Sequence, residues 1–265
     1  MTMKVDMLEL SERSARFVLS NTTPAFANSI RRAMLADVPT FAIDDLNIYN
    51  NTSVLYDEQL GLRLALIPLA TENIDDYTTQ DECTCEEGCP SCEVSITLSA
   101  EGPKMVYSGD LISSDPGIQP ADTNIPIIEL KEDQRVVLEA LAHKGLGKDN
   151  AKWQAGVACG YKNLPLIRVN NCDKCGLCVS ECPKGIIYLD EEGAKVADEN
   201  LMDCILCKLC EEACEIDAIS VKEDESSFLF TVESDGSYSS QQLIINAGNT
   251  IKAKATEMQE ILNNL

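Results

Sequence analysis

Eight cysteines between residues 172 and 214 form a duplicated pattern. The first repeat reads Cys172-x2-Cys175-x2-Cys178-x3-Cys182, and the second reads Cys204-x2-Cys207-x2-Cys210-x3-Cys214. Two-residue gaps bring three thiolates close together, and a fourth thiolate completes the coordination of a four-iron cubane. This is the spacing of proteins that hold two [4Fe-4S] clusters, in which the fourth cysteine of each repeat ligates the other cluster.

That exchange predicts two ligand sets. The cofactor-binding residues of one cluster would be Cys172, Cys175, Cys178 and Cys214, and those of the other Cys204, Cys207, Cys210 and Cys182. Gly176 and Gly185 leave room for backbone N–H groups to approach the cluster sulfides. Glu215 stands where the first repeat has Pro183, so the turn of the second repeat could differ. The alternative is two zinc sites, which normally use two separated cysteine pairs.

A second cysteine group lies within ten residues of loop-like sequence. It reads Cys83-x-Cys85-x3-Cys89-x2-Cys92, with Gly88 and Pro90 between its members. Four thiolates in such a short segment can meet one tetrahedral ion, and zinc is the candidate metal. The alternative is a loop without metal, with its cysteines reduced or joined by disulfides.

The remaining reactive residues predict no catalytic site. His143 is the one histidine of the chain, and its Lys- and Gly-rich surroundings favour a solvated loop. Cys159 stands outside both cysteine groups and is expected to be an ordinary buried thiol. Gly145–Lys148 lacks the full pattern of a phosphate-binding loop. We therefore expect no catalytic residue on this chain.

Composition limits the classes of function. Asp plus Glu number 44 against 21 for Lys plus Arg in 265 residues, a net charge of −23 at pH 7. This charge would repel a nucleic-acid backbone, so strong direct nucleic-acid binding is not expected. No apolar run is long enough for a membrane span, and the acidic first residues do not form a secretory signal. We expect a cytoplasmic protein, whose reduced thiols favour metal binding.

Both ends of the chain contain elements that could support these sites. Val5–Leu10 and Ala15–Leu19 read as a hairpin. A helix is expected over residues 24–37, capped by Thr22 or Thr23. A second helix is expected over 239–265, where Ser239 and Gln242 suggest a capping box. Its apolar residues recur every three or four positions, so it could pack on its own sheet or on a partner.

Three segments resemble the alpha-like subunit family of multisubunit RNA polymerases, and in particular its archaeal, D-type members. They are Asn28–Asp44 (NSIRRAMLADVPTFAID), Tyr56–Leu69 (YDEQLGLRLALIPL) and Gly147–Gln154 (GKDNAKWQ). Asn150 departs from the family, where a histidine is usual. The Cys83–Cys92 loop resembles a zinc loop of relatives, and a ferredoxin-like insert is found in some archaeal members.

The resemblance implies an α+β fold and a non-catalytic platform for polymerase assembly. A discontinuous dimerisation domain would comprise residues 1–40 and 225–265. A mixed, β-rich middle domain (41–165) and a ferredoxin-like [4Fe-4S] domain (166–224) would be inserted into it. The implied partners are subunit L in a heterodimer, subunits N and P, and the large catalytic subunits.

Two other functions are compatible with the clusters. Two neighbouring cubanes are typical of an electron-transfer subunit of a redox enzyme. A cluster-based sensor of oxygen or iron is the other alternative. An electron carrier needs only the insert, which leaves about 200 residues with polymerase-like motifs unexplained.

Overall fold

The structure is a computed structural model, and it describes residues 2–85 and 88–264. The chain divides into two compact units. The first contains Met1–Leu8, Arg16–Ala27 and Gly160–Phe230, and the second contains Glu9–Ala15, Asn28–Cys159 and Thr231–Leu265. Among the described residues, no helix combines the length and apolar character needed to cross a membrane. Helices and sheets are both present, which confirms the α+β class.

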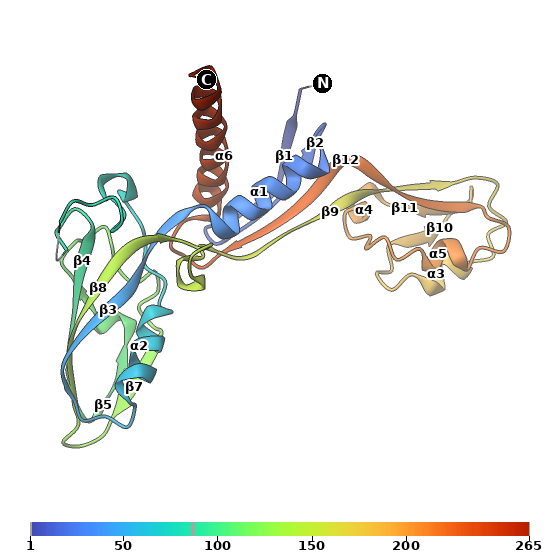
Figure 1. Ribbon diagram of the computed structural model, residues 1–265. Coiled ribbons are helices and arrows are strands. Elements are labelled where there is room, and N and C mark those ends of the chain that lie inside the picture. The colour runs from blue at the N-terminus through green and yellow to red at the C-terminus, as the bar shows by residue number, and fades with distance from the viewer. Residues whose placement is uncertain (1, 86–87, 265) are drawn as a thin grey trace. The chain divides into compact units, whose positions relative to one another are not determined.

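A four-stranded sheet has the order β1-β2-β12-β9 (Figure 1). Its strands are β1 (Lys4–Leu10), β2 (Ser14–Ser20), β12 (Ile219–Ser234) and β9 (Gly156–Val169). Strands β1 and β2 are neighbours, as the predicted hairpin requires. Phe17 of β2 stacks on Phe230 of β12, with ring centroids 5.0 Å apart. Strand β1 is an edge strand, and nearly all of its side chains are exposed.

The two predicted helices are present. Helix α1 spans Pro24–Ala36, and the Thr23 hydroxyl accepts a hydrogen bond from the Phe26 N–H at 3.3 Å. Helix α6 spans Ser240–Asn263, and the Ser239 hydroxyl accepts from the Gln242 N–H at 3.2 Å. The Gln242 side chain donates to Asn246 one turn further on. The predicted capping box is therefore present only in its Ser239 half.

The first and second halves of α6 differ in burial. Leu243 and Ala247 are fully buried, and the Ser240 hydroxyl donates to the carbonyl oxygen of Ser11 at 2.6 Å. From Lys252 onward every described residue of the helix is exposed. This exposed half includes Met258, Ile261 and Leu262, at 63%, 57% and 57% exposure. The apolar face that the sequence predicts for α6 is thus buried in the second unit only over the first half of the helix.

A second four-stranded sheet forms the core of the second unit. Its order is β3-β8-β4-β6, with β3 (Pro39–Asn51), β8 (Arg135–Leu146), β4 (Glu93–Glu101) and β6 (Ile112–Ser113). Alternate side chains of β4 and β8 are buried, which is the two-residue period of a half-buried strand. They pack with Leu60 and Leu64 of α2 (Asp57–Ala65) in one core.

Smaller elements complete the second unit. Strands β5 (Lys104–Tyr107) and β7 (Pro126–Leu130) pair with each other. Three single-turn 3-10 helices are η1 (Ile74–Asp76), η2 (Ser108–Asp110) and η3 (Ala151–Trp153). Asn150 precedes η3, and its side chain accepts a hydrogen bond from the Lys152 N–H at 3.1 Å. Asn150 therefore caps this short helix.

The cysteine-rich segment lies between β9 and β12 in the first unit (Figure 1). It contains α3 (Leu177–Glu181), the β10–β11 hairpin (Ile187–Leu189 and Ala194–Val196), α4 (Asp198–Leu201) and α5 (Leu209–Glu212). Its buried cluster includes few large apolar side chains, chiefly Ile186, Ile187, Ile219 and Val221. Three of the eight cysteines belong to the same buried cluster, so much of this core consists of the thiols themselves.

Candidate metal centres

The structure brings together the four cysteines predicted for the first cluster. They line one cavity, with Val169 from the end of β9 and Ile219 from the start of β12: Cys172, Cys175, Cys178 and Cys214. Burial raises the pKa of the Cys178 thiol, and the other three cysteines act in the same direction through their charges. The fourth cysteine therefore comes from the second repeat.

The four cysteines predicted for the second cluster line a separate cavity. They are Cys182, Cys204, Cys207 and Cys210. Burial raises the pKa of Cys210 to about 11, and the charges of the other three cysteines act in the same direction. Ile167, Ile186 and Val221 form part of the wall. Each repeat thus supplies three thiols to one cavity and one thiol to the other, which is the exchange that two [4Fe-4S] clusters require.

The turn that follows each repeat is the same despite Glu215. In the first repeat the Gly185 N–H donates to the carbonyl oxygen of Cys182 at 3.0 Å, and in the second the Asp217 N–H donates to Cys214 at 3.1 Å. Gly185 has φ +60° and Asp217 has φ +52°. A left-handed residue three positions after the cysteine sets this turn, so proline is not needed for it.

Backbone N–H groups point at the cysteine sulfurs in both repeats. The Lys174 N–H donates to Cys172 Sγ at 3.4 Å, and the Leu206 N–H donates to Cys204 Sγ at 3.5 Å. The Ala218 N–H donates to Cys214 Sγ at 3.1 Å. Lys174 and Leu206 both have positive φ, which turns their N–H groups inward. These donors can stabilise thiolates, and the two cavities fit the chemistry of cubane ligation.

The other cysteine group is more compact. The Sγ atoms of Cys83, Cys85, Cys89 and Cys92 all lie within 4.8 Å of one another. Three Sγ–Sγ distances are 3.6 Å (Cys83 to Cys89), 3.6 Å (Cys85 to Cys92) and 3.8 Å (Cys89 to Cys92). Sulfurs bound at ~2.3 Å to one tetrahedral ion are about 3.8 Å apart. The described part of this loop, which omits residues 86 and 87, fits a single ion.

The thiols of this quartet differ in acidity. A hydrogen bond from the Cys85 backbone is the largest cause that lowers the pKa of Cys83, to about 6. Burial raises the pKa of Cys92 to about 12. Cys92 is fully buried, whereas the other three are partly exposed. One partly exposed thiol is therefore readily ionised, and the buried one needs a cation to become a thiolate.

The histidine prediction is wrong. His143 lies on β8 and is 2% exposed, so it is not in a solvated loop. Its Nε2 lies 3.5 Å from a carboxylate oxygen of Asp45, and neither ring nitrogen has a hydrogen-bond partner. The strand continues through Lys144 and Gly145 because both residues have tertiary contacts. Cys159 is half-buried on β9, and burial raises its pKa to about 11.

One pair of residues near the second cavity was not predicted. The Lys162 ammonium donates to the carbonyl oxygens of Met202 and Cys204, at 2.7 and 2.8 Å. The Arg16 guanidinium forms an ion pair with Asp203 at 3.2 Å. Lys162 stands about 40 positions before these residues and Arg16 almost 190, so no local spacing in the sequence could indicate these contacts.

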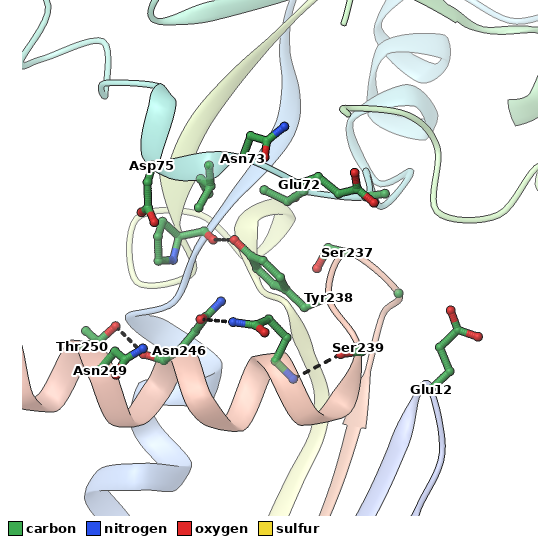
Figure 2. Close-up of a pocket in the computed structure, with 16 residues that line it drawn as sticks. Glu12, Glu72, Asn73, Asp75, Ser237, Tyr238, Ser239, Asn246, Asn249 and Thr250 are labelled. Carbon is green, nitrogen blue, oxygen red and sulfur yellow. Dashed lines mark hydrogen bonds between the residues drawn. The ribbon is translucent and has the colours of Figure 1, made fainter. Parts of the chain in front are cut away.

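A polar cavity of about 780 Å³ lies elsewhere, in the second unit. It is lined by the start of α6, the segment 70–75 and Tyr238, whose hydroxyl donates to the carbonyl oxygen of Pro39 at 2.7 Å (Figure 2). Its labelled side chains are carboxylates, amides and hydroxyls. No cysteine or histidine lines this cavity among the described residues.

Two protein families match segments of this chain, and one of them is an iron–sulfur family. Residues 46–158 match the RNA polymerase Rpb3/RpoA insert domain, and residues 171–218 match the 4Fe-4S dicluster domain. The second range contains all eight cysteines of the duplicated pattern. Together, these two matches indicate the class of RNA polymerase subunits that carry a 4Fe-4S dicluster domain.

Relatives narrow this class to one family. The DNA-directed RNA polymerase subunit Rpo3 of Methanosarcina acetivorans is 65% identical over 267 aligned residues, which cover 100% of each chain. The Rpo3 of Archaeoglobus fulgidus is 44% identical over 99% of this chain and 98% of its own. That of Halobacterium salinarum is 40% identical over 97% and 96%. The chain belongs to the Rpo3 family of archaeal RNA polymerase subunits.

Proposed function

We propose that this chain is a non-catalytic assembly subunit of an archaeal DNA-directed RNA polymerase, working in the cytoplasm. The observation that carries this proposal is the end-to-end match to Rpo3 proteins. An electron-transfer subunit is not favoured, because the match is not limited to residues 171–218.

We propose two [4Fe-4S] clusters and one zinc ion as its metals. Two separate cavities, each with four cysteines, support the clusters. The close Sγ–Sγ distances of Cys83, Cys85, Cys89 and Cys92 support zinc in the other site. When bound, each cluster joins thiolates from both repeats. Metal binding would then supply folding free energy to a segment with few large apolar residues.

Subunit L is the proposed partner in a heterodimer. Two exposed apolar surfaces support a protein partner. One is the edge strand β1 and its flank, with Met3, Val5, Met7, Leu8 and Leu10 exposed, and the other is the outer half of α6, with Met258, Ile261 and Leu262 exposed. Exposed apolar residues on an edge strand, and on a helix whose last three turns are exposed, are typical of a surface that another chain covers.

The further partners and the domain limits follow from the family. We propose that subunits N and P and the two large subunits bind after the heterodimer forms. We propose residues 1–40 and 225–265 as the dimerisation domain, 41–165 as the middle domain and 166–224 as the ferredoxin-like domain. The family matches at residues 46–158 and 171–218 support the two inserted domains.

Purification from the native organism tests this proposal. A tagged copy of the chain should copurify, under anaerobic conditions, with the large polymerase subunits and with subunit L in equal amounts. The purified complex should transcribe DNA. Copurification with an oxidoreductase, and absence of polymerase subunits, would overturn the proposal in favour of electron transfer.

A further inference from the structure

Lys162 stands outside both cysteine repeats, yet it contacts the backbone of a predicted cluster ligand. We propose that Lys162 is a positioning residue for the second cluster: it holds the segment Met202–Cys204 to strand β9, assisted by Arg16 on β2. This inference rests on the proposed binding of two [4Fe-4S] clusters. It goes beyond that binding because it assigns a residue that fixes where one of the clusters sits.

The contacts of Lys162 are short and directed at one segment. Its ammonium donates to the carbonyl oxygens of Met202 and Cys204, at 2.7 and 2.8 Å. The residue between them, Asp203, forms an ion pair with Arg16 at 3.2 Å. Three consecutive residues that end at a cluster cysteine are thus bound by two cations from two strands. Hydrogen bonds from charged donors contribute more than neutral ones to such an attachment.

The ligands proposed for the first cluster are closer to the two strands along the chain. Cys172 follows the last residue of β9 by three positions, and Cys214 precedes the first residue of β12 by five. Both strands therefore position that ligand set through the chain itself. The Asn170 N–H also donates to the carbonyl oxygen of Ala218 at 2.8 Å, which joins the two strand ends.

The second ligand set is farther from the strands along the chain. Cys182 follows α3, and Cys204 lies between α4 and α5, more than 30 residues beyond the end of β9. Apolar contacts with Ile167 and Val221 help to hold this site. The polar contacts of Lys162 and Arg16 fix the Cys204 end of it. Loss of these contacts should therefore affect the second cluster and leave the first unchanged.

The charge around the second cavity is also distinctive. The Lys162 ammonium lies 2.8 Å from the carbonyl oxygen of the ligand Cys204, and the Arg16 guanidinium lies 3.2 Å from Asp203. Lys184 and Lys208 line the same cavity, whereas Asp173 lines the cavity of the first cluster. Nearby positive charge favours the more negative, reduced form of a cluster. Lys162 should then raise the reduction potential of the second cluster.

Three variants of the full chain test the proposal, purified anaerobically. Lys162→Met removes the ammonium, Lys162→Arg keeps a cation that can donate to both carbonyl oxygens, and Lys222→Met is a matched control. Lys222 is an exposed lysine on β12 in the same unit, and its loss changes the net charge by the same amount. The measurements are total iron, iron release to a chelator, and a redox titration followed by electron paramagnetic resonance.

The redox titration adds electrons and moves no atoms. Dithionite dissociates into two SO2•− radical anions. Each radical gives one electron to one cluster and is itself oxidised to SO2, which water hydrates to bisulfite. The cysteine ligands stay bound, and no proton is transferred. Two midpoint potentials are therefore expected, one for each cluster.

The substitution Lys162→Met is expected to affect only the iron of the second cluster, which is half of the total. In Lys162→Met, about half of the iron should leave about tenfold faster than in the wild type, and the other half at the wild-type rate. One of the two potentials should fall by ~59 mV, which corresponds to a tenfold weaker preference for the reduced form. Lys162→Arg and Lys222→Met should behave like the wild type.

Other outcomes overturn the inference, and they are distinguishable. In one outcome, the wild-type protein holds about eight iron, and Lys162→Met releases its iron at the wild-type rate and keeps both reduction potentials. This result would exclude the positioning role of Lys162 and leave the cluster proposal intact. The same conclusion follows if both halves of the iron, or both potentials, change equally. A wild-type protein without iron after anaerobic purification would overturn the cluster proposal itself, and this inference with it.

Discussion

At the scale of single residues, the cysteines of the insert both pack in its core and provide ligands for metal. Cys178, Cys204 and Cys210 are buried and pack with Ile187, as apolar side chains would. As thiolates, however, the clustered sulfurs of each ligand set would repel one another without a cation between them. Their contribution to folding therefore depends on metal, and each ligand set can be removed separately.

Replacing Cys172 and Cys175 by Ser should remove one cluster. The wild-type chain should hold about eight iron and eight acid-labile sulfides, and the double variant about half of each, because each cavity contains its own four cysteines. Iron and sulfide analysis after anaerobic purification measures this. Cys159→Ser is the control, since this half-buried thiol lines neither cavity. Full iron content in the double variant would contradict the ligand sets.

The Cys83–Cys92 quartet should hold one zinc independently of the iron. Cys89→Ser removes a thiol whose Sγ lies 3.6 Å from Cys83 and 3.8 Å from Cys92, so the zinc content should fall from about one to near zero. The iron content should not change, because effects at distant sites are usually additive. Elemental analysis of both metals checks this. Iron in this site, or no metal in reduced wild-type protein, would disprove the prediction.

His143 shows where single-residue reasoning from sequence fails. Its neighbours Lys144 and Gly145 are typical of loops, yet both have tertiary roles. The Lys144 ammonium donates to the carbonyl oxygens of Ile74 and Tyr77, at 3.0 and 2.8 Å. A Cβ at Gly145 would lie 2.3 Å from the ring of Trp153, so a bare backbone is required there. Such partners are distant in sequence, and composition alone cannot reveal them.

At the scale of elements, the sequence correctly predicted the features that depend on neighbouring residues, namely the N-terminal caps of the two long helices and the apolar face of α6. Thr23 and Ser239 accept from the first-turn N–H groups of α1 and α6, as their types predict. The three-to-four-residue period of α6 also predicts an apolar face correctly. It could not show that Leu243 is buried in the chain's own fold while Ile261 is exposed, because burial depends on contacts with residues far away in the sequence.

A charge on the outer half of α6 should weaken the heterodimer. Ile261→Asp should weaken binding of subunit L by about 10–100-fold, since burying a large apolar side chain contributes about 1.5–3 kcal/mol. The isolated chain should keep its stability, because Ile261 is 57% exposed. Titration of the purified subunits measures the affinity.

A neighbouring substitution separates burial from charge. Asn264→Asp adds the same charge at an exposed polar position near the end of the helix. It should change the affinity little, by less than about threefold. Equal effects of the two variants, or none from Ile261→Asp, would place the interface elsewhere.

At the scale of the whole molecule, the family motifs predicted the polymerase-subunit family and the α+β fold class, and both are confirmed. The division into a dimerisation domain and two inserted domains stays a prediction. The exchange of the fourth ligand between repeats was predicted from the spacing of two-cluster ferredoxins. It stays a prediction, supported by two cavities that each contain one predicted set of four cysteines. The contacts of Lys162 and Arg16 were not predicted, since they join residues far apart in sequence. What holds the cluster domain to its strands is therefore visible only in three dimensions.

The last prediction concerns the order of assembly. Residues 168–220 contain 5 Lys plus Arg and 12 Asp plus Glu, a net charge of −7, around a small apolar core. Without metal, this segment should lose its structure locally. The exposed residues of β1 and α6 that we assign to subunit L lie outside it. Cys204→Ser with Cys207→Ser should therefore leave the affinity for subunit L within about threefold of wild type.

The defect should appear when the larger subunits bind. If the larger subunits bind the cluster domain, the same double variant should be incorporated into whole polymerase at least about tenfold less than the wild type, because that domain is unfolded although the heterodimer is present. Cys159→Ser should be incorporated normally. Dimer yield and polymerase yield, measured in parallel after reconstitution, test both steps. Normal assembly and transcription, together with a lost ability to reduce an electron acceptor, would show that the clusters serve redox chemistry, because a structural role cannot separate these effects.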